Sequence, residues 1–350
     1  MTRRTTSLSV AVLALIVLIG VAVLVPVPYV VMSPGLTENT IGEFKGEPVI
    51  VIKGARTYPT AGNLDLTTVS VTSPESAVHL PDVLSAWWST EQIILPREVV
   101  YPPEQSVEQV KQENEVQMLD SMDSARAVGL AQAGVDAVRV KVQAVTPGAP
   151  ADGVLRKDDE IVAVDSTPIL STQDAVEVIS AIEPGTRITL EITRDGASRE
   201  VEVTTAPSPD DSSQSRVGVT LRDDFDPPFE VDIELGQEIG GPSAGLMFSL
   251  GIYDKLTPGA LTGGAHIAGT GTIDASGTVG EIGGIQQKIA GARDDGATVF
   301  LVPADDCADV GRFVDDEEIR LVAVATMVEA VEALESLRAG NETAVGGCDG

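Results

Sequence analysis

The first apolar segment of the chain is a run without charge that follows two arginines. Arg3 and Arg4 are the only charged residues before Glu38, and residues 8–31 are almost wholly apolar. A membrane-spanning helix needs about 20 such residues, and positive residues on one flank keep that flank in the cytoplasm. A cleaved signal peptide is the alternative, but no small-residue cleavage site follows the run. The pattern predicts a retained single-pass anchor within residues 1–35, with the rest of the chain outside.

The segments after this run show first strand patterns and then a helical one. Residues 48–53 and 64–71 are rich in β-branched side chains and are separated by a turn-forming stretch, which is typical of neighbouring strands. In residues 104–133, by contrast, Val, Met, Leu and Ala recur at helical spacing among charged residues and glutamines. The pattern predicts a small sheet followed by one long helix or a broken pair of helices.

A second set of short strands begins at Val138 and contains one helix. The expected strands cover residues 138–145, 159–165, 188–196 and 198–205, and the expected helix covers residues 171–182. Residues 206–216 are rich in proline, serine and aspartate, a composition typical of a linker. We therefore expect a separate β-rich module that ends in a linker.

Strand and helix patterns alternate through residues 217–340. Strand-like segments at residues 217–221 and 229–235 precede a glycine cluster, and an apolar helical stretch follows over residues 246–256. Such alternation indicates mixed α/β structure. Together with the β-rich module, the fold class of the whole chain is expected to be α+β (mixed α/β), and residues 341–350 are expected to form a flexible tail.

Charge narrows the range of partners. The 350 residues carry a formal net charge of −30, and no basic stripe is present that could neutralise phosphates. Nucleic acid is therefore excluded as a partner.

Cysteine and histidine are scarce. A location outside the cytoplasm would permit a disulfide between Cys307 and Cys348, but the sequence leaves open whether these two cysteines meet. With two histidines and scattered cysteines, a zinc site is not expected. We expect neither a metal nor a cofactor.

Ser243 is the strongest candidate for a catalytic nucleophile. It lies between Gly241, Pro242, Ala244 and Gly245, where backbone can approach a substrate closely and a helix is expected to begin. Unpaired amides at a helix start favour the negative charge of a developing oxyanion. Because a serine hydroxyl is a weak nucleophile by itself, a neighbouring base must remove its proton.

Two residues could act as that base. His266 would complete a G-x-S-x-G nucleophile elbow, but it lies too near Ser243 for the strands and acidic residue that an esterase fold places between them. A structural or surface role is the other interpretation of His266. Lys288 lies among apolar residues, and burial there would lower the pKa of its ammonium so that a neutral amine could form. The alternative for Lys288 is a solvated lysine on an amphipathic helix.

Three motifs in the β-rich module point to a known family. They are Pro147-Gly148-Ala149-Pro150-Ala151, the spacing of Leu155, Asp159 and Ile161, and the turn Arg194-Asp195-Gly196. Residues 126–205 thereby resemble a PDZ domain of the bacterial kind. PDZ domains add a peptide carboxy terminus to a sheet edge as a strand, and the loop for its carboxylate is expected before Val138. There, residues 129–134 depart from the Gly-Leu-Gly-Phe type. The resemblance implies binding of C-terminal peptides; a module that only gates or positions the catalytic part is the alternative.

An ordered set of motifs also runs through the C-terminal part. Its members are Gly241-Pro242-Ser243-Ala244-Gly245, Gly269-Thr270-Gly271-Thr272-Ile273, Gly277, Val279, Ile282-Gly283-Gly284, Lys288, Ala292, Gly296-Ala297 and Val302-Pro303. This set resembles the proteolytic domain of Lon proteases over residues 217–337. The resemblance implies that Ser243 is the nucleophile, that Lys288 is the general base and that Thr270 orients the lysine. It also implies an oxyanion hole around Ser243 and Ala244, beside Gly241 and Pro242, and assembly into a hexameric ring.

Three departures from the Lon pattern shape the functional prediction. Gly240 stands where the family has an acidic residue, and Thr272 stands where it has a glutamate. More consequential, the chain contains no G-x-x-x-x-G-K-[ST] phosphate loop, so ATP is not expected as a partner. An anchor and a PDZ-like module take the place of the ATPase, an arrangement that resembles membrane-anchored PDZ and Lon-like proteins of Gram-positive bacteria. Residues 36–125 are expected to belong to the proteolytic domain, with the PDZ-like module inserted before Ser243.

These observations predict an ATP-independent serine endopeptidase that is anchored in the cell membrane. Its expected substrates are exported or unfolded polypeptides, cleaved on the extracytoplasmic side through a Ser-Lys dyad. A scaffold that binds exported protein tails without catalysis is the alternative.

Overall fold

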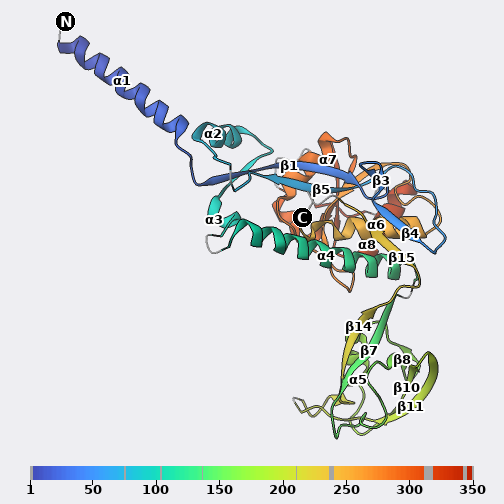
Figure 1. Cartoon of the computed structure of the whole chain (residues 1–350). Helices are drawn as coiled ribbons and strands as arrows, with labels where there is room; N and C mark the ends of the chain where they lie inside the picture. The colour runs from blue at the N-terminus through green and yellow to red at the C-terminus, as the bar shows by residue number, and fades with distance from the viewer. Residues whose placement is uncertain are drawn as a thin grey trace. The chain divides into compact units, whose positions relative to one another are not determined.

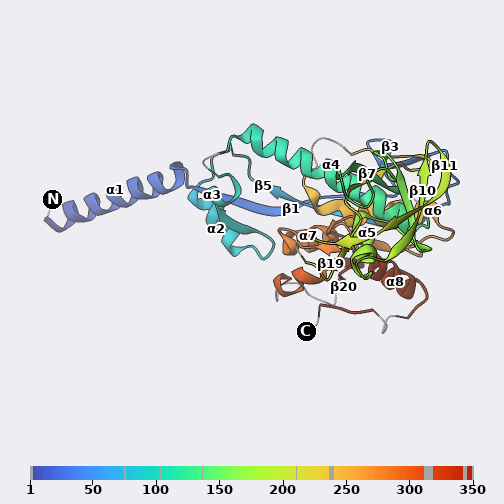
Figure 2. The ribbon, with the colours of Figure 1, turned by 90° about the horizontal axis from the view of Figure 1, so that it is seen from below.

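The chain forms two compact units in the computed structural model (Figures 1 and 2). The structure describes residues 3–74, 76–102, 105–135, 137–209, 211–235, 240–310, 318–341 and 345–348. Residues 1–133 and 229–350 make up unit 1, and residues 134–228 make up unit 2. Unit 1 is therefore assembled from two parts of the sequence that lie on either side of unit 2.

The apolar run at the N-terminus is divided between two elements. Helix α1, Arg3–Leu24, ends before Pro26 and Pro28, which lack the N–H that a continuing helix requires, and strand β1, Tyr29–Asn39, follows. Among the described residues, no helix is long and apolar enough to cross a membrane. The transmembrane helix expected within residues 8–31 is thus not supported by the structure.

A six-stranded sheet forms the centre of unit 1. Its strand order is β20-β19-β16-β5-β1-β6. The strands besides β1 are β5 (Asn63–Val71), β6 (Ile93–Pro96), β16 (His266–Gly269), β19 (Val299–Pro303) and β20 (Arg320–Val324). Strands β5, β16, β19 and β20 run parallel, and β1 is antiparallel to both of its neighbours. The strand predicted at residues 64–71 is confirmed as β5, and it joins the early segment to the C-terminal one.

Helices pack against this sheet and fix its buried side chains. Helix α7 (Ile285–Asp294) contacts β1, β5 and β16, while α6 (Gly245–Leu256) contacts β5 and the long helix α4 (Val107–Gln132). The sequence predicted either one long helix or a broken pair of helices here, and the structure has one, α4. Because side chains alternate along a strand, Asp65, Thr67 and Val69 share one side of β5. Val69 lies beside Gly284 at the start of α7, so this side is the one that α7 covers.

The remaining elements of unit 1 are short. They are β2 (Glu43–Phe44), β3 (Glu47–Pro48), β4 (Ile50–Lys53), α2 (Leu80–Trp88), α3 (Arg97–Val100), β15 (Glu230–Ile233), η1 (Pro242–Ala244), β17 (Thr272–Ile273), β18 (Val279–Gly280), η2 (Ala304–Asp309) and α8 (Met327–Arg338). Strand β4 pairs with β15 in antiparallel orientation. Segments that precede and follow unit 2 in the sequence are therefore neighbours in unit 1.

Unit 2 is a β-rich module with one helix. Its sheet has the order β11-β10-β8-β7-β14, and α5 lies against it. The elements are β7 (Val138–Val145), β8 (Glu160–Val164), β9 (Thr167–Pro168), α5 (Thr172–Ser180), β10 (Arg187–Arg194), β11 (Ala197–Thr204), β12 (Ala206–Pro207), β13 (Ser215–Arg216) and β14 (Val219–Phe225). Apolar side chains that alternate along these strands, such as Ile188, Leu190 and Ile192, are fully buried in its core.

The end of unit 2 differs from the prediction. Residues 206–216 were expected to be a linker, and the proteolytic part was expected to begin at Val217. Instead, β12 pairs with β13, and β14 pairs with β7 along its whole length, from Val219–Val145 to Phe225–Val138. Strand β14 supplies the outer edge of the sheet, so unit 2 continues to Pro228.

The C-terminal residues that the structure describes are held in place rather than free. Cys307 and Cys348 form a disulfide, and the Ala323 amide donates to the carbonyl of Gly346 at 3.1 Å. The expectation of a flexible tail over residues 341–350 is therefore wrong for residues 346–348. Residues 342–344 and 349–350 lie outside the described part.

Candidate active site

Ser243 is positioned by the short helix η1, which leads into α6. Gly241, just before η1, has a φ of +95°, a conformation that favours glycine, and Pro242 then sets the first helical position. The Ser121 hydroxyl on α4 donates to the Pro242 carbonyl at 2.8 Å. A side chain at Gly245 would meet Ser121 Oγ at 2.8 Å, so only glycine allows α4 to approach this closely. Ser121 therefore contacts the turn both before Ser243, at Pro242, and after it, at Gly245.

Two backbone amides beside the serine remain as candidates for an oxyanion hole. Pro242 has no N–H, and the Gly241 amide donates to the carbonyl of Asn114 at 3.4 Å. The amides of Ser243 and Ala244 lie in the first helical turn, where intrahelical acceptors are missing. Of the residues predicted to support the oxyanion, Gly241 and Pro242 therefore shape the site without offering a free amide.

Lys288 is buried on α7, in the second turn after Gly284. Its exposed fraction is 3%, and burial lowers the pKa of its ammonium from 10.5 to about 8, against an opposing effect of the Asp306 carboxylate. A lysine with this pKa is partly neutral near physiological pH. The interpretation of Lys288 as a solvated surface lysine is thus wrong, because apolar residues of α7 and the sheet enclose it.

Thr270 connects the lysine to the turn that carries the serine. Lys288 Nζ lies 2.9 Å from Thr270 Oγ1, and Thr270 Oγ1 lies 3.0 Å from the Ser243 carbonyl oxygen. A hydroxyl has one hydrogen, which Thr270 directs to the Ser243 carbonyl, so Lys288 must be the donor in the other bond. A neutral Lys288 would then keep its lone pair free for a further proton.

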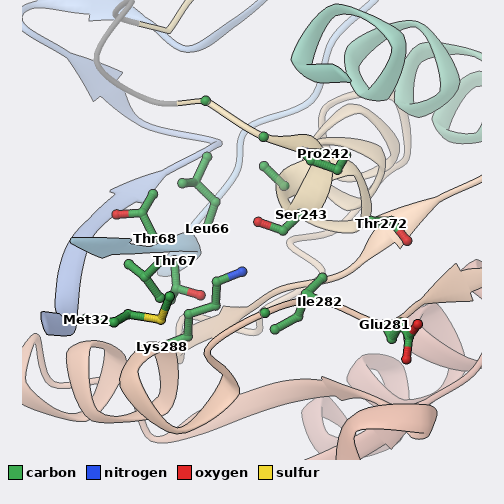
Figure 3. Close-up of a pocket in the computed structure, with 15 residues that line it drawn as sticks. Met32, Leu66, Thr67, Thr68, Pro242, Ser243, Thr272, Glu281, Ile282 and Lys288 are labelled. Atoms are coloured by element: carbon green, nitrogen blue, oxygen red, sulfur yellow. The ribbon is translucent and has the colours of Figure 1, made fainter. Parts of the chain in front are cut away.

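Ser243 and Lys288 line the same cavity. The cavity has a volume of about 510 Å³, and its walls also include Thr67, Gly240 and Thr272. Figure 3 shows the Lys288 amine and the Ser243 hydroxyl pointing into the same space from α7 and η1. Within the described residues, the Ser243 hydroxyl makes no hydrogen bond of its own. The space between these two side chains is open to a third molecule.

The sequence analysis missed two acidic residues at this site, Asp306 and Glu281. Glu281 lines the cavity. Asp306 is buried in η2 and accepts a hydrogen bond from the Ile282 amide at 3.0 Å. Burial raises the pKa of Asp306, while that hydrogen bond lowers it. Its position directly after the apolar strand β19 was the available signal, because the carboxyl ends of parallel strands meet at one edge of a sheet.

His266 is not placed to act on Ser243. Its Nε2 lies 2.5 Å from Asp65 Oδ2, a residue of the neighbouring strand β5. This pairing gives His266 a partner on the α7 side of the sheet, so the esterase interpretation has no geometric support.

The carboxylate loop predicted for the PDZ-like module does not lie at residues 129–134. Gly129 and Leu130 are buried in the last turns of α4, which belongs to unit 1. A Cβ atom at Gly129 would meet the Ser249 carbonyl oxygen of α6 at 2.8 Å. Glycine is required there for helix packing. In unit 2, β11 and β14 are the edge strands of the sheet, and the turn before β14 contains Gly218, with a φ of +80°.

Comparisons with known proteins find two family models that match parts of this chain. Residues 237–336 match the family model of the Lon protease (S16) C-terminal proteolytic domain, and residues 107–205 match that of the PDZ domain. The chain therefore carries a Lon-type proteolytic domain together with a PDZ domain, which supports a serine protease.

Individual relatives match over part of their length. A Lon protease from Clostridioides difficile is 34% identical over 26% of this chain and 12% of its own length. Lon protease 2 of Bacillus subtilis is 31% identical over 31% of this chain and 19% of its own length. The chain thus spans less than a fifth of these relatives. The crystal structure of the PDZ domain of an SdrC-like protein from Listeria monocytogenes is 20% identical, with a TM-score of 0.22, over 23% of this chain and 85% of that one.

Proposed function

We propose that this protein is a serine endopeptidase that uses Ser243 as nucleophile and Lys288 as general base. The observation that carries the proposal is that a buried lysine, with its pKa lowered to about 8, shares a cavity with a serine at a helix start. Serine becomes a useful nucleophile only beside a group that takes its proton, and a neutral lysine is such a group.

The reaction follows from the positions of these groups. Neutral Lys288 takes the Ser243 proton as Oγ attacks the peptide carbonyl, and the amides of Ser243 and Ala244 hold the oxyanion. The resulting lysine ammonium returns its proton to the leaving amine, which leaves an acyl-enzyme. Water then attacks the acyl group while Lys288 takes its proton, and the serine is restored when that proton returns to Oγ. Thr270 keeps the amine in position through both steps.

Cleavage without ATP is part of the proposal. The 350 residues contain no phosphate-loop motif, so the chain itself has no means to unfold a stable substrate. We therefore expect unfolded or exported polypeptides as substrates, and a hexameric ring as the assembly that the Lon resemblance implies.

For unit 2 we propose that C-terminal peptides bind along edge strand β14, beside helix α5. An edge strand has unpaired backbone groups that an extended peptide can use, and the turn at Gly218 would hold the carboxylate. Asp223 on β14 accepts hydrogen bonds from the amide and hydroxyl of Thr172 at the start of α5, at 2.7 and 3.0 Å. This pair joins β14 to the start of α5, so a peptide bound along β14 must displace it or end before it. Unit 2 would then select substrates or gate their access.

Attachment to a membrane, with the catalytic part outside the cytoplasm, also remains a proposal. Its support is the apolar sequence after Arg3 and Arg4 and the exposed tryptophans of α2, Trp87 at 74% and Trp88 at 83% exposure. Tryptophan is enriched where membranes meet water. Fractionation of the full chain, with carbonate washing of the membranes, tests this: release into the soluble fraction would contradict it.

The test of the peptidase uses the full chain, without ATP, on a library of peptides derived from a proteome. Ser243→Ala and Lys288→Ala are expected to abolish cleavage, and His266→Gln is the matched control that should retain it. Cleavage that survives Ser243→Ala would assign the activity to another nucleophile. No cleavage by any form would favour the alternative, a scaffold that binds exported tails, which the missing hydrogen bond at the Ser243 hydroxyl allows.

A further inference from the structure

Outside the catalytic cavity, a second group of ionisable side chains meets on the α7 side of the sheet. Asp65 of β5, His266 of β16 and Asp295, which caps the C-terminus of α7, each offer one donor atom of a kind that binds metals. These three donor atoms all lie within 4.8 Å of one another. We propose that they bind a divalent transition-metal cation of the Zn²⁺ or Mn²⁺ class.

The first argument is the state of Asp65. Its exposed fraction is 2%, Oδ2 is bonded to His266, and within the described residues Oδ1 has no hydrogen-bond partner. A buried carboxylate oxygen without a partner is unfavourable, and proteins seldom retain one without a reason. Asn63 also has a side chain close enough to Asp65 to influence its carboxyl, and a bound cation would give Oδ1 a direct partner.

The second argument is the balance of charge. Nε2 of His266 lies 2.5 Å from Asp65 Oδ2 and 3.8 Å from Asp295 Oδ2, and Glu38 is on the neighbouring strand β1. The carboxylates of this group therefore outnumber its single histidine. Asp295 also lies at the C-terminus of α7, where the helix dipole adds negative potential. A divalent cation would neutralise this excess of negative charge.

The donor set indicates the class of metal. Imidazole nitrogen favours Zn²⁺ and similar transition metals, whereas sites for Mg²⁺ and Ca²⁺ consist of oxygen donors. One histidine with two carboxylates is a donor set that Zn²⁺ and Mn²⁺ accept, with Glu38 or water completing the coordination. The sequence analysis expected no metal site. Two carboxylates and one histidine from three distant segments show no spacing pattern in the sequence that could have indicated one.

The position of the site gives it a consequence for the catalytic centre. Its three ligands lie on or beside elements that form the catalytic cavity: β5 carries Thr67 of the cavity wall, β16 leads directly to Thr270, and α7 carries Lys288. A bound cation would fasten the C-terminus of α7 to β5 and β16. We therefore expect it to stabilise unit 1 without touching substrate.

The test is made on full-length protein carrying Ser243→Ala, so that it does not depend on peptidase activity. After treatment with chelator, ZnCl2 is titrated by calorimetry, and bound Mn²⁺ is counted by electron paramagnetic resonance, with MgCl2 as comparator. One Zn²⁺ or Mn²⁺ per chain, tighter than Mg²⁺ and accompanied by a rise in Tm, is expected. Failure of both Zn²⁺ and Mn²⁺ to bind at up to millimolar concentration would overturn the proposal.

Variants locate the bound ion. His266→Gln and Asp295→Asn should each weaken binding by about tenfold or more, since each removes one ligand. Asp295 is half exposed, so its variant should fold even if a variant at buried Asp65 does not. Asp294→Asn is the matched control: this carboxylate is one residue away, pairs with Arg293, and should be dispensable. Binding that is unchanged in His266→Gln and Asp295→Asn would place the ion elsewhere and reject the site.

Discussion

Lys288 Nζ donates a hydrogen bond of 2.9 Å to Thr270 Oγ1. We expect Thr270→Val, which preserves the shape of the side chain but removes the hydroxyl, to lower kcat/KM by about tenfold or more, because a misplaced base transfers protons poorly. Thr270→Ser should retain most of the activity. Kinetics on one cleaved peptide measure both effects. Equal activity in the valine variant and the parent would show that the hydroxyl does not position the base.

The lowered pKa of Lys288 predicts a specific pH profile. The amine must be neutral to accept the serine proton, so kcat/KM should rise about tenfold per pH unit below the pKa of about 8 and level off above it. The direction follows because burial disfavours the ammonium form. Peptide cleavage from about pH 6 to about pH 10 measures the profile. A limb that disappears in His266→Gln would instead identify the histidine as the base.

Asp306 should tune that profile. Its carboxylate raises the pKa of Lys288 and so acts against the effect of burial. In Asp306→Asn, the side chain can still accept from the Ile282 amide, but the negative charge is gone. The acidic limb of the rate profile is therefore expected to move to lower pH. A shift to higher pH would mean that the asparagine perturbs the site by displacement rather than by charge.

Gly129 provides a test of the packing of α4 on α6. A methyl group there would lie 2.8 Å from the Ser249 carbonyl oxygen and 2.9 Å from Ile252 Cβ. Gly129→Ala is expected to lower the free energy of unfolding by about 1–3 kcal/mol, because two helix backbones would have to move apart. Urea unfolding followed by circular dichroism measures it. Ala131→Ser, at an exposed position of the same turn, should change the free energy by less than about 0.5 kcal/mol.

The disulfide links η2 to the C-terminal segment across 41 residues of sequence. Cys307→Ser with Cys348→Ser is expected to lower the free energy of unfolding by about 2–4 kcal/mol, because the unfolded chain gains conformational freedom. Reduction of the parent should produce a similar loss. Identical unfolding curves for oxidised and reduced parent protein would contradict this expectation.

Regular patterns made much of the fold predictable. The strand at residues 138–145 was expected at its observed bounds, and α4, α5 and α6 were expected within a few residues of theirs. Strand β1 was not recognised, because its first residues, Tyr29–Val31, continue an apolar run that looks like part of a helix. Strand β14 was assigned to the wrong unit for a related reason: local pattern indicates a strand but not the strand with which it pairs.

The candidate site was predictable where one motif supplied neighbouring residues. Ser243 and its flanking glycines belong to a single turn, so their placement together could be inferred from local sequence. Asp306 and the pair of Asp65 with His266 could not, since 201 residues of sequence separate that pair and only the parallel pairing of β5 with β16 brings it together. The burial of Lys288 likewise depends on the sheet that α7 covers.

The two ends of unit 2 leave its sheet as neighbours. Val138 and Phe225 are paired across β7 and β14, and the Asp226 amide donates to the Ala137 carbonyl at 2.9 Å. When the first and last strands of a module pair with each other, its two ends are close together. Such a module can be inserted into, or removed from, a single loop of another domain at little cost in chain entropy. Replacement of residues 134–228 by a short glycine-containing turn should thus leave unit 1 able to fold by itself, and other small domains could be inserted at the same position.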